Sequence, residues 1–175
     1  MQVLGVAGWS GSGKTTLITR LIGILVGYGI TVSTIKHAHH EFDIDKKRKD
    51  SFKHRVAGAH EVLVGSAKRW ALMHELRCED EPSLEELLDK MSDVDLVLVE
   101  GFKFGHHEKI EVYRAELGKP LLCPEDSKIV AVVTDDALPS SEQTLFRPND
   151  VEGLARFVVS RYQIIKVDER PVNKI

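Results

Sequence analysis

Cysteine is scarce in this sequence, and charge is nearly balanced. The two cysteines, Cys78 and Cys123, stand far apart among 175 residues and form no Cys-x-x-Cys pair. Two cysteines cannot build a disulfide framework, so we interpret them as reduced thiols. The formal net charge is only −3, so the molecule as a whole lacks the positive charge that attracts nucleic acid. The basic run Lys46–Lys49 is local, and is typical of a solvated loop or of a contact to a phosphorylated ligand.

Long apolar runs are absent as well. No run approaches the roughly 20 residues that a membrane-spanning helix needs. The first residues lead directly into an apolar strand and lack the pattern of a signal peptide. We therefore expect a cytoplasmic protein with no membrane partner. The length suits a single domain with a proper core.

The stretch Gly8–Thr15 fits the P-loop pattern of Gly, four residues, Gly, Lys and then Ser or Thr. An apolar strand is expected before it, at 3–7, and a helix after it, from Lys14 to about Gly27, which is the context that the motif requires. In such a loop, backbone N–H groups point at phosphate oxygens. We expect Lys14 to reach the β- and γ-phosphates and the Thr15 hydroxyl to hold Mg²⁺. The residues predicted to bind phosphate are Gly11, Ser12, Gly13, Lys14, Thr15 and Thr16.

A second strong pattern is a buried strand that ends in an acidic residue. Residues 96–99 are all apolar, and Glu100 and Gly101 follow them. A P-loop protein needs an acidic group at such a place to organise Mg²⁺ or its waters. We therefore predict Glu100 as a metal partner and, with Lys14, as a catalytic group. Asp95 stands at the opposite end of the strand and should be remote.

A β-branched strand expected at 30–35 ends in a polar segment. Ligands of open α/β sheets lie beyond the carboxyl ends of the strands, so this segment should lie near the phosphates. Lys36, His37, His39 and Asp50 are predicted to border the γ-phosphate or a second ligand. A metal site is the weaker interpretation, because the adjacent His39 and His40 do not easily share a ligand face.

The other elements are expected as short strands and helices. The predicted ranges are a helix at 50–59 capped by Asp50 or Ser51, strands at 61–66 and 70–74, a helix from 82 or 83 to about 90, a buried strand at 129–134, a short strand at 145–146, and a helix from 151 to about 162 capped by Asn149 or Asp150. Residues 109–114 alternate apolar and polar, which is typical of an edge or half-exposed strand. The tail 163–175 has no clear element and is left unassigned.

Asp135 is the candidate for recognising the base. It follows the buried strand at 129–134, where nucleotide-binding proteins of this class carry a base-reading segment, although the usual Asn-Lys-x-Asp signature is absent. A carboxylate can accept both N1–H and the N2 amine of guanine, whereas adenine offers an acceptor at N1 and would leave a buried group unpaired. GTP is therefore favoured modestly over ATP.

Several stretches resemble, in order, the MobB family of molybdopterin-guanine dinucleotide biosynthesis adaptor proteins, over Met1 to about Tyr162. The stretches that carry the resemblance are the P-loop with Thr16 and Leu17, Ile35-Lys36-His37-x-His39-His40, Lys49-Asp50-Ser51, Ala57-Gly58-Ala59, Arg69-Trp70-Ala71, Leu98-Val99-Glu100-Gly101-Phe102-Lys103 and Asn149–Ala155.

The resemblance implies an α/β P-loop NTPase fold, with a mostly parallel sheet flanked by helices. It implies one GTP-binding domain at 1–162, with a β excursion at about 60–76 and 107–116 that serves homodimerisation. It also implies GTP as the bound nucleotide, Mg²⁺, weak GTPase activity, and an adaptor role in molybdenum cofactor biosynthesis. The partners expected are the MobA nucleotidyltransferase and molybdopterin or molybdenum cofactor.

Two other functions remain open from the residues. A P-loop kinase for a small metabolite would need a lid with arginines, and only Arg69 and Arg77 are candidates for such a lid. A metal-insertion GTPase would use the histidines at 37–40 and 106–107 as ligands.

Overall fold

The structure is a computed structural model that describes residues 1–38, 42, 44–103, 105–138 and 143–164. The chain divides into two compact units, residues 1–37 with 89–175 and residues 38–88. The excursion predicted at 60–76 lies in the second unit, and the part predicted at 107–116 lies in the first. The tail from residue 165 lies outside the described residues.

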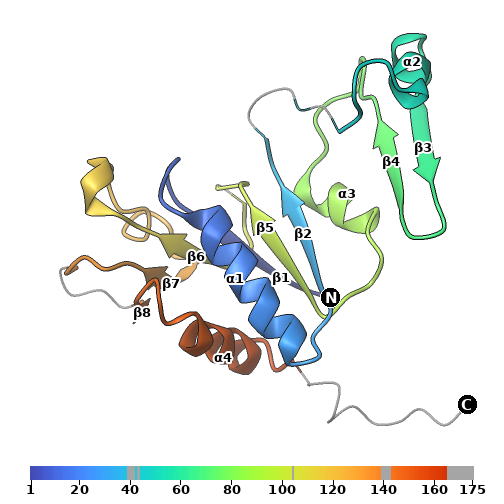
Figure 1. Cartoon of the computed structure of the whole chain (residues 1–175). Helices are drawn as coiled ribbons and strands as arrows, with labels where there is room; N and C mark the ends of the chain where they lie inside the picture. Colours follow the sequence, from blue (N-terminus) through green and yellow to red (C-terminus); the bar gives the residue numbers. More distant parts are fainter. Residues whose placement is uncertain (39–41, 43, 104, 139–142, 165–175) are drawn as a thin grey trace, which may run out of the picture. The chain divides into compact units, whose positions relative to one another are not determined.

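The first unit is built on a six-stranded sheet in which every neighbouring pair runs parallel (Figure 1). The strands, in sheet order, are β2 (Val32–Lys36), β5 (Leu96–Glu100), β1 (Gln2–Ala7), β6 (Lys109–Val112), β7 (Ile129–Val133) and β8 (Thr144–Phe146). The helices are α1 (Lys14–Gly27), α4 (Val151–Arg161) and the short 3₁₀ turn η1 (Ala115–Leu117). The predicted fold class, a mostly parallel sheet flanked by helices, is confirmed.

Helix α1 covers one face of this sheet together with α4, on which it packs (Figure 1). Its buried residues Leu17, Leu21 and Leu25 recur every four positions and join one core with the strands and α4. The helix ends at Gly27, and Gly29 follows with a φ of 75°, a conformation that favours glycine. The predicted helix therefore forms with the expected bounds.

The carboxyl ends of β2, β5 and β1 lie side by side. Glu100 is the register partner of Val6 in β1 on one side and of Lys36 in β2 on the other. The segments that follow these ends therefore leave the sheet at the same edge, as the sequence predicted.

The expectation of an edge strand at 109–114 is wrong. β6 is four residues long, lies between β1 and β7, and is buried at every position. Its two charged residues are buried with partners. Lys109 Nζ donates to the carbonyl of Gly105 at 2.6 Å and pairs with Asp126 at 3.0 Å. Glu111 accepts backbone N–H bonds from residues 122 and 123 at 2.8 and 2.9 Å. The alternating pattern came from these satisfied buried charges, not from solvent on one face.

The second unit holds α2 (Asp50–Val56), the antiparallel hairpin of β3 (Glu61–Gly65) and β4 (Trp70–His74), and most of α3 (Leu84–Asp89). α2 packs on β3. The predicted side-chain cap of α2 is not formed, because Lys49 occupies the cap position and Asp50 is the first helical residue. α3 begins with reciprocal bonds between Ser83 and Glu86, which stabilise its first turn.

Asp150 caps α4 by accepting from the N–H of Gly153, as predicted.

Within the described residues, no helix combines the length and apolar character that crossing a membrane requires.

Candidate nucleotide site

The loop between β1 and α1 has a backbone that depends on glycine. Gly8, Gly11 and Gly13 have φ values of 141°, 82° and 99°, which residues with a Cβ rarely adopt. A Cβ on Gly8 would lie 2.5 Å from the carbonyl oxygen of Val112, so the loop also lies close against the end of β6. The strand–loop–helix context that the motif requires is therefore present.

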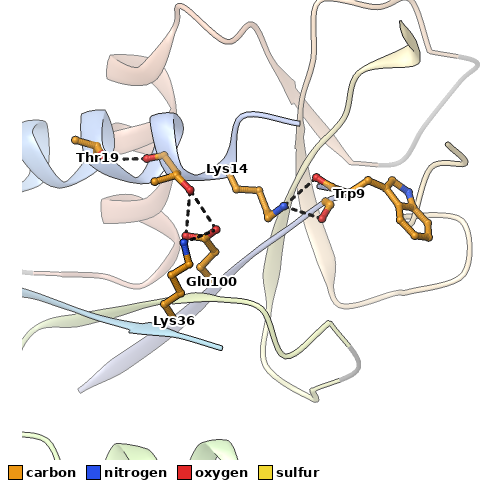
Figure 2. Close-up of polar contacts among 7 residues, drawn as sticks. Trp9, Lys14, Thr19, Lys36 and Glu100 are labelled. Carbon is orange, nitrogen blue, oxygen red and sulfur yellow. Dashed lines mark hydrogen bonds and ion pairs between the residues drawn. The ribbon is translucent and has the colours of Figure 1, made fainter. Parts of the chain in front are cut away.

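Lys14 folds back over this loop (Figure 2). Its ammonium donates to the carbonyl oxygens of Gly8 at 3.0 Å and Trp9 at 2.9 Å. Burial lowers the pKa of Lys14; Glu100 opposes this shift, whereas Lys103 and Lys36 add to it. A phosphate anion at the loop would stabilise the charged form of this ammonium.

Two further observations fit an anion at this place. The hydroxyl oxygen of Ser12 is buried and has no hydrogen-bond partner among the described residues. The N-terminus of α1 begins after Gly13 with no side-chain cap and no acidic residue in its first turn. Its backbone N–H groups and its positive dipole end are therefore available to a phosphate.

Thr15 in the first turn of α1 is hydrogen-bonded to Glu100 at the end of β5, which is labelled in Figure 2. The Thr15 hydroxyl donates to the two carboxylate oxygens of Glu100 at 3.2 and 3.4 Å. Lys36 Nζ lies 3.7 Å from the same carboxylate, which is 16 % exposed. A hydroxyl and a carboxylate beside a phosphate site are oxygen donors of the kind that Mg²⁺ takes, so these residues fit the ion.

The predicted site residues divide into those that the structure brings together and those that it does not. The P-loop residues Gly11–Thr16 lie with Glu100 and Lys36 at one edge of the sheet. His37 follows Lys36, and its ring lies 4.6 Å from that of Phe102. His39 lies outside the described residues, and Asp50 belongs to the second unit, so the prediction that they border the site stays open.

Asp135 lies in the segment that follows β7, and its side chain is 77 % exposed. Arg147 donates to the Asp135 carbonyl at 2.5 Å and lies 3.8 Å from its carboxylate. The carboxylate of the neighbouring Asp136 accepts instead from the N–H of Ala115. Asp135 is thus the member of this pair that is open to a ligand.

Sequence reasoning missed Arg114 at the P-loop. Its Nε donates to the carbonyl of Ser12 at 3.0 Å, and its Nη2 would lie 3.5 Å from a Cβ on Gly13. Arg114 follows the carboxyl end of β6, next to β1. The rule that functional residues follow strand ends would have found it, had β6 been placed inside the sheet.

A second missed feature is the aromatic ring of Trp9 in the loop. Lys103 and Lys119 lie over this ring at 4.7 and 5.7 Å, and its indole N–H donates to the carbonyl of Pro120. The loop is therefore framed by cations on the side of Trp9 as well as by Arg114.

The histidines that suggested metal chemistry have other surroundings. A Cβ on Gly5 would lie 2.5 Å from the ring of His107, which therefore packs directly on β1. Within the part of the chain that the structure describes, neither His37 nor the pair at 106–107 belongs to a group of three metal-ligating side chains.

The parallel sheet with its helices defines an α/β protein, and the glycine-rich loop before the first helix, with a carboxylate at the end of the neighbouring strand, fits the P-loop pattern. The sequence model of MobB, molybdopterin guanine dinucleotide synthesis protein B, matches residues 3–135. The chain belongs to the MobB family.

Relatives span nearly the whole chain. A molybdopterin-guanine dinucleotide biosynthesis adapter protein of Escherichia coli K12 is 45% identical over 166 residues, which cover 93% of this chain and 94% of that protein. A protein of the same description from Haemophilus influenzae is 41% identical over 162 residues, 90% of this chain and 88% of that one.

Solved structures agree in fold. A crystal structure of molybdopterin-guanine biosynthesis protein B superposes with a TM-score of 0.72 at 32% identity, covering 92% of this chain and 99% of that one. A MobB homologue from Bacillus stearothermophilus gives a TM-score of 0.70 at 24% identity, over 93% and 99% of the two chains, and shows the fold alone.

Proposed function

We propose that this chain is a GTP-binding adaptor with weak, Mg²⁺-dependent GTPase activity, which assists the synthesis of molybdopterin guanine dinucleotide. The observation that carries the proposal is the meeting of Thr15 and Glu100 beside Lys14 and the glycine-rich loop. The adaptor role rests on relatives that are described as molybdopterin-guanine dinucleotide biosynthesis adapter proteins.

The phosphates would be held by the loop and the start of α1. Backbone N–H groups from Gly11 to Thr16 and the Ser12 hydroxyl would bind their oxygens, and Lys14 would leave the Gly8 and Trp9 carbonyls for the β- and γ-phosphates. Thr15 and Glu100 would hold Mg²⁺, Glu100 directly or through a bound water. The ion would neutralise charge on the phosphates.

Hydrolysis would be slow because Glu100 has other partners. Its carboxylate is engaged by Thr15 and lies near Lys36, so it would serve to hold the metal ion and not to take a proton from water. It would position the attacking water without removing its proton early. Binding, and not turnover, would then be the main use of the nucleotide.

Asp135 would give the preference for guanine. Its exposed carboxylate can accept from guanine N1–H and from the N2 amine, and Arg147 would hold its backbone in place. Adenine offers neither donor on that edge, so ATP would bind more weakly.

The segment at the end of β2 would border the binding site of a second ligand. Lys36 ends the strand and His37 follows it, at the edge that carries the P-loop, and both would border the γ-phosphate or the phosphate of molybdopterin. The nucleotidyltransferase of the MobA type would be the partner that joins GMP to the molybdenum-carrying pterin.

The hairpin of β3 and β4 would serve homodimerisation. Leu63, Trp70 and Leu72 are 64%, 67% and 45% exposed, and the register places Leu63 opposite Leu72 on one face. An apolar strand surface of this kind is a hazard for a monomer and is suited to a second copy.

The two free cysteines, one of them exposed, are in keeping with a reducing compartment, which we take to be the cytoplasm.

Calorimetry with GTP and ATP in Mg²⁺ tests the nucleotide assignment. We expect GTP to bind more tightly, Lys14→Ala to abolish binding, and Asp135→Ala to equalise the two nucleotides. The exposed residues Lys68 and Asp80 supply control variants to alanine, which should bind as the wild type does. Equal affinity of GTP and ATP for the wild type would remove the base assignment, and unchanged affinity in Lys14→Ala would remove the phosphate site.

A second arm tests the adaptor role. Molybdenum cofactor and the nucleotidyltransferase are combined with GTP, and formation of the dinucleotide is followed with and without this chain. We expect the chain to increase product formation and Lys14→Ala to lose that increase. No increase with the wild type would contradict the adaptor role and leave the nucleotide result standing.

A further inference from the structure

Three metal-ligating side chains meet at the open end of the hairpin in the second unit. His60 immediately precedes β3, His74 ends β4, and Glu79 lies in the turn that follows. One donor atom from each lies within 4.8 Å of the other two, and all three residues are exposed. None of them contributes to the nucleotide site proposed above.

The spacing of the donor atoms suits a small transition-metal ion. The Glu79 carboxylate oxygens lie 3.6 Å from His60 Nε2 and 3.4 Å from His74 Nε2. Two ligands bound at about 2.1 Å with a tetrahedral angle between them are themselves about 3.4 Å apart. An ion could therefore enter with small side-chain rotations.

A fourth residue orients one of these ligands. Glu61 accepts at 2.8 Å from the Nδ1 of His74, which turns the Nε2 of that ring towards Glu79. A carboxylate on the far nitrogen of a ligating histidine is the usual outer partner in zinc sites, because it fixes the tautomer and raises the basicity of the ligating nitrogen.

The backbone holds Glu79 beside the strands. The N–H of Glu79 donates to the Leu76 carbonyl at 2.7 Å, and Arg77 takes a φ of 49° within this turn. The Arg77 guanidinium donates to the carbonyl of Ala59, the residue before His60. The turn that carries Glu79 is thus tied to the segment that carries His60, so the three ligands are arranged in advance.

We propose that His60, His74 and Glu79 form a binding site for Zn²⁺ or a similar transition-metal ion, oriented by Glu61 and separate from the Mg²⁺ site at the P-loop. Two imidazoles with one carboxylate favour such an ion over Mg²⁺ and Ca²⁺, which prefer oxygen ligands alone. The bound ion links the start of β3, the end of β4 and the following turn, and so closes the open end of the hairpin. Water completes its coordination.

The test uses the full-length protein without nucleotide or Mg²⁺. Zn²⁺ is titrated against a competing chromophoric chelator, and Co²⁺ is used as a spectroscopic probe. We expect each chain to bind one equivalent of Zn²⁺ at this site. His60→Ala and His74→Ala should each lower the affinity for Zn²⁺ at least about 10-fold. His54→Ala, an exposed histidine of α2 outside the cluster, is the matched control and should bind as the wild type does.

Two further variants test the orienting role of Glu61 and the part played by the exposed thiol of Cys78. Glu61→Gln should lower the affinity for Zn²⁺ by about 10-fold while keeping the Co²⁺ spectrum, as expected of a positioning residue. Cys78→Ser should change neither the affinity for Zn²⁺ nor the Co²⁺ spectrum, because the thiol is not part of the cluster. Circular dichroism confirms that each variant is folded. Affinity that is insensitive to both His60→Ala and His74→Ala, or lost in Cys78→Ser, would overturn the proposal.

Discussion

Thr15 and Glu100 are 85 positions apart in the sequence, and their side chains share a hydrogen bond of 3.2 Å. Two local facts bring them together. Thr15 lies in the first turn of α1, directly after the glycine loop, and Glu100 ends β5, the parallel neighbour of β1. The contact is therefore a consequence of the sheet order, and it puts a carboxylate where the phosphates of a bound nucleotide would need a cation.

Glu100→Gln separates metal binding from phosphate binding. The amide can still accept from Thr15 but carries no charge, so it should bind Mg²⁺ poorly. It also removes a negative charge beside the phosphates. We expect GTP affinity in the presence of Mg²⁺ to fall about 10-fold, equivalent to about 1.4 kcal/mol, and affinity in EDTA to stay equal or rise. Calorimetry in both conditions measures this. Glu85→Gln, an exposed residue of α3, controls for net charge; an equal loss with and without Mg²⁺ would refute the metal role.

Two glycine substitutions in neighbouring elements should have opposite effects. Gly8→Ala places a Cβ 2.5 Å from a backbone carbonyl oxygen at a φ of 141°, so we expect a loss of more than about 2 kcal/mol in stability and loss of nucleotide binding. Gly23→Ala, on the exposed side of α1, meets nothing within 4 Å and should stabilise by about 0.5–1 kcal/mol. Urea unfolding measures the change in the free energy of unfolding for each variant. A tolerated Gly8→Ala would mean that the loop is not held against β6.

The sequence was sufficient for the parts of the fold and site that depend on local patterns. Glycine spacing, the apolar run before Glu100 and the leucine period of α1 each led to the element that the structure contains. The same reasoning failed at β6, because an alternating pattern cannot distinguish solvent from buried partners. Lys109 and Glu111 are satisfied by groups at 105, 122, 123 and 126, and those contacts exist only after folding. Arg114 was missed for the same reason.

Arg114 should matter to nucleotide binding. Its Nε holds the Ser12 carbonyl, and its guanidinium lies beside Gly13, where it adds positive charge to the loop. We expect Arg114→Ala to lower GTP affinity by about 10-fold and Arg114→Lys to recover only part of it, because lysine restores the charge without the Nε bond. Arg156→Ala, on the exposed side of α4, is the control. Full recovery by lysine would assign the effect to charge alone, and an unchanged Arg114→Ala would exclude a role.

The contact between Glu108 and Arg161 should make stability sensitive to acid. Arg161 donates two bonds to this carboxylate and Tyr162 donates a third, and the Arg161 bonds in particular lower the pKa of Glu108 below its ordinary 4.5. The contribution is therefore present above about pH 4.5 and is lost as the pH falls through the lowered pKa. Because both side chains are more than a third exposed, we expect a coupling of about 1 kcal/mol at pH 7 in a double-mutant cycle of Glu108→Gln with Arg161→Ala. Thermal unfolding between pH 3 and 7 should show a shallower acid decline for Glu108→Gln, and an identical decline would contradict the assignment.

The exposed face of the β3–β4 hairpin gives the proposed homodimer a direct test. A charge placed at the centre of an apolar interface must be desolvated without a partner, which costs several kcal/mol, whereas the same charge on a free surface costs little. Trp70→Glu and Leu72→Glu should therefore produce monomers while leaving the fold intact, since both side chains are exposed within one chain. Light scattering after size exclusion measures the mass, and circular dichroism checks the fold. Val26→Glu, at a valine of α1 that is 55% exposed, adds the same charge in the other unit and should leave the mass of the wild type unchanged. A wild-type monomer, or a dimer that survives both hairpin substitutions, would show that this face has another use.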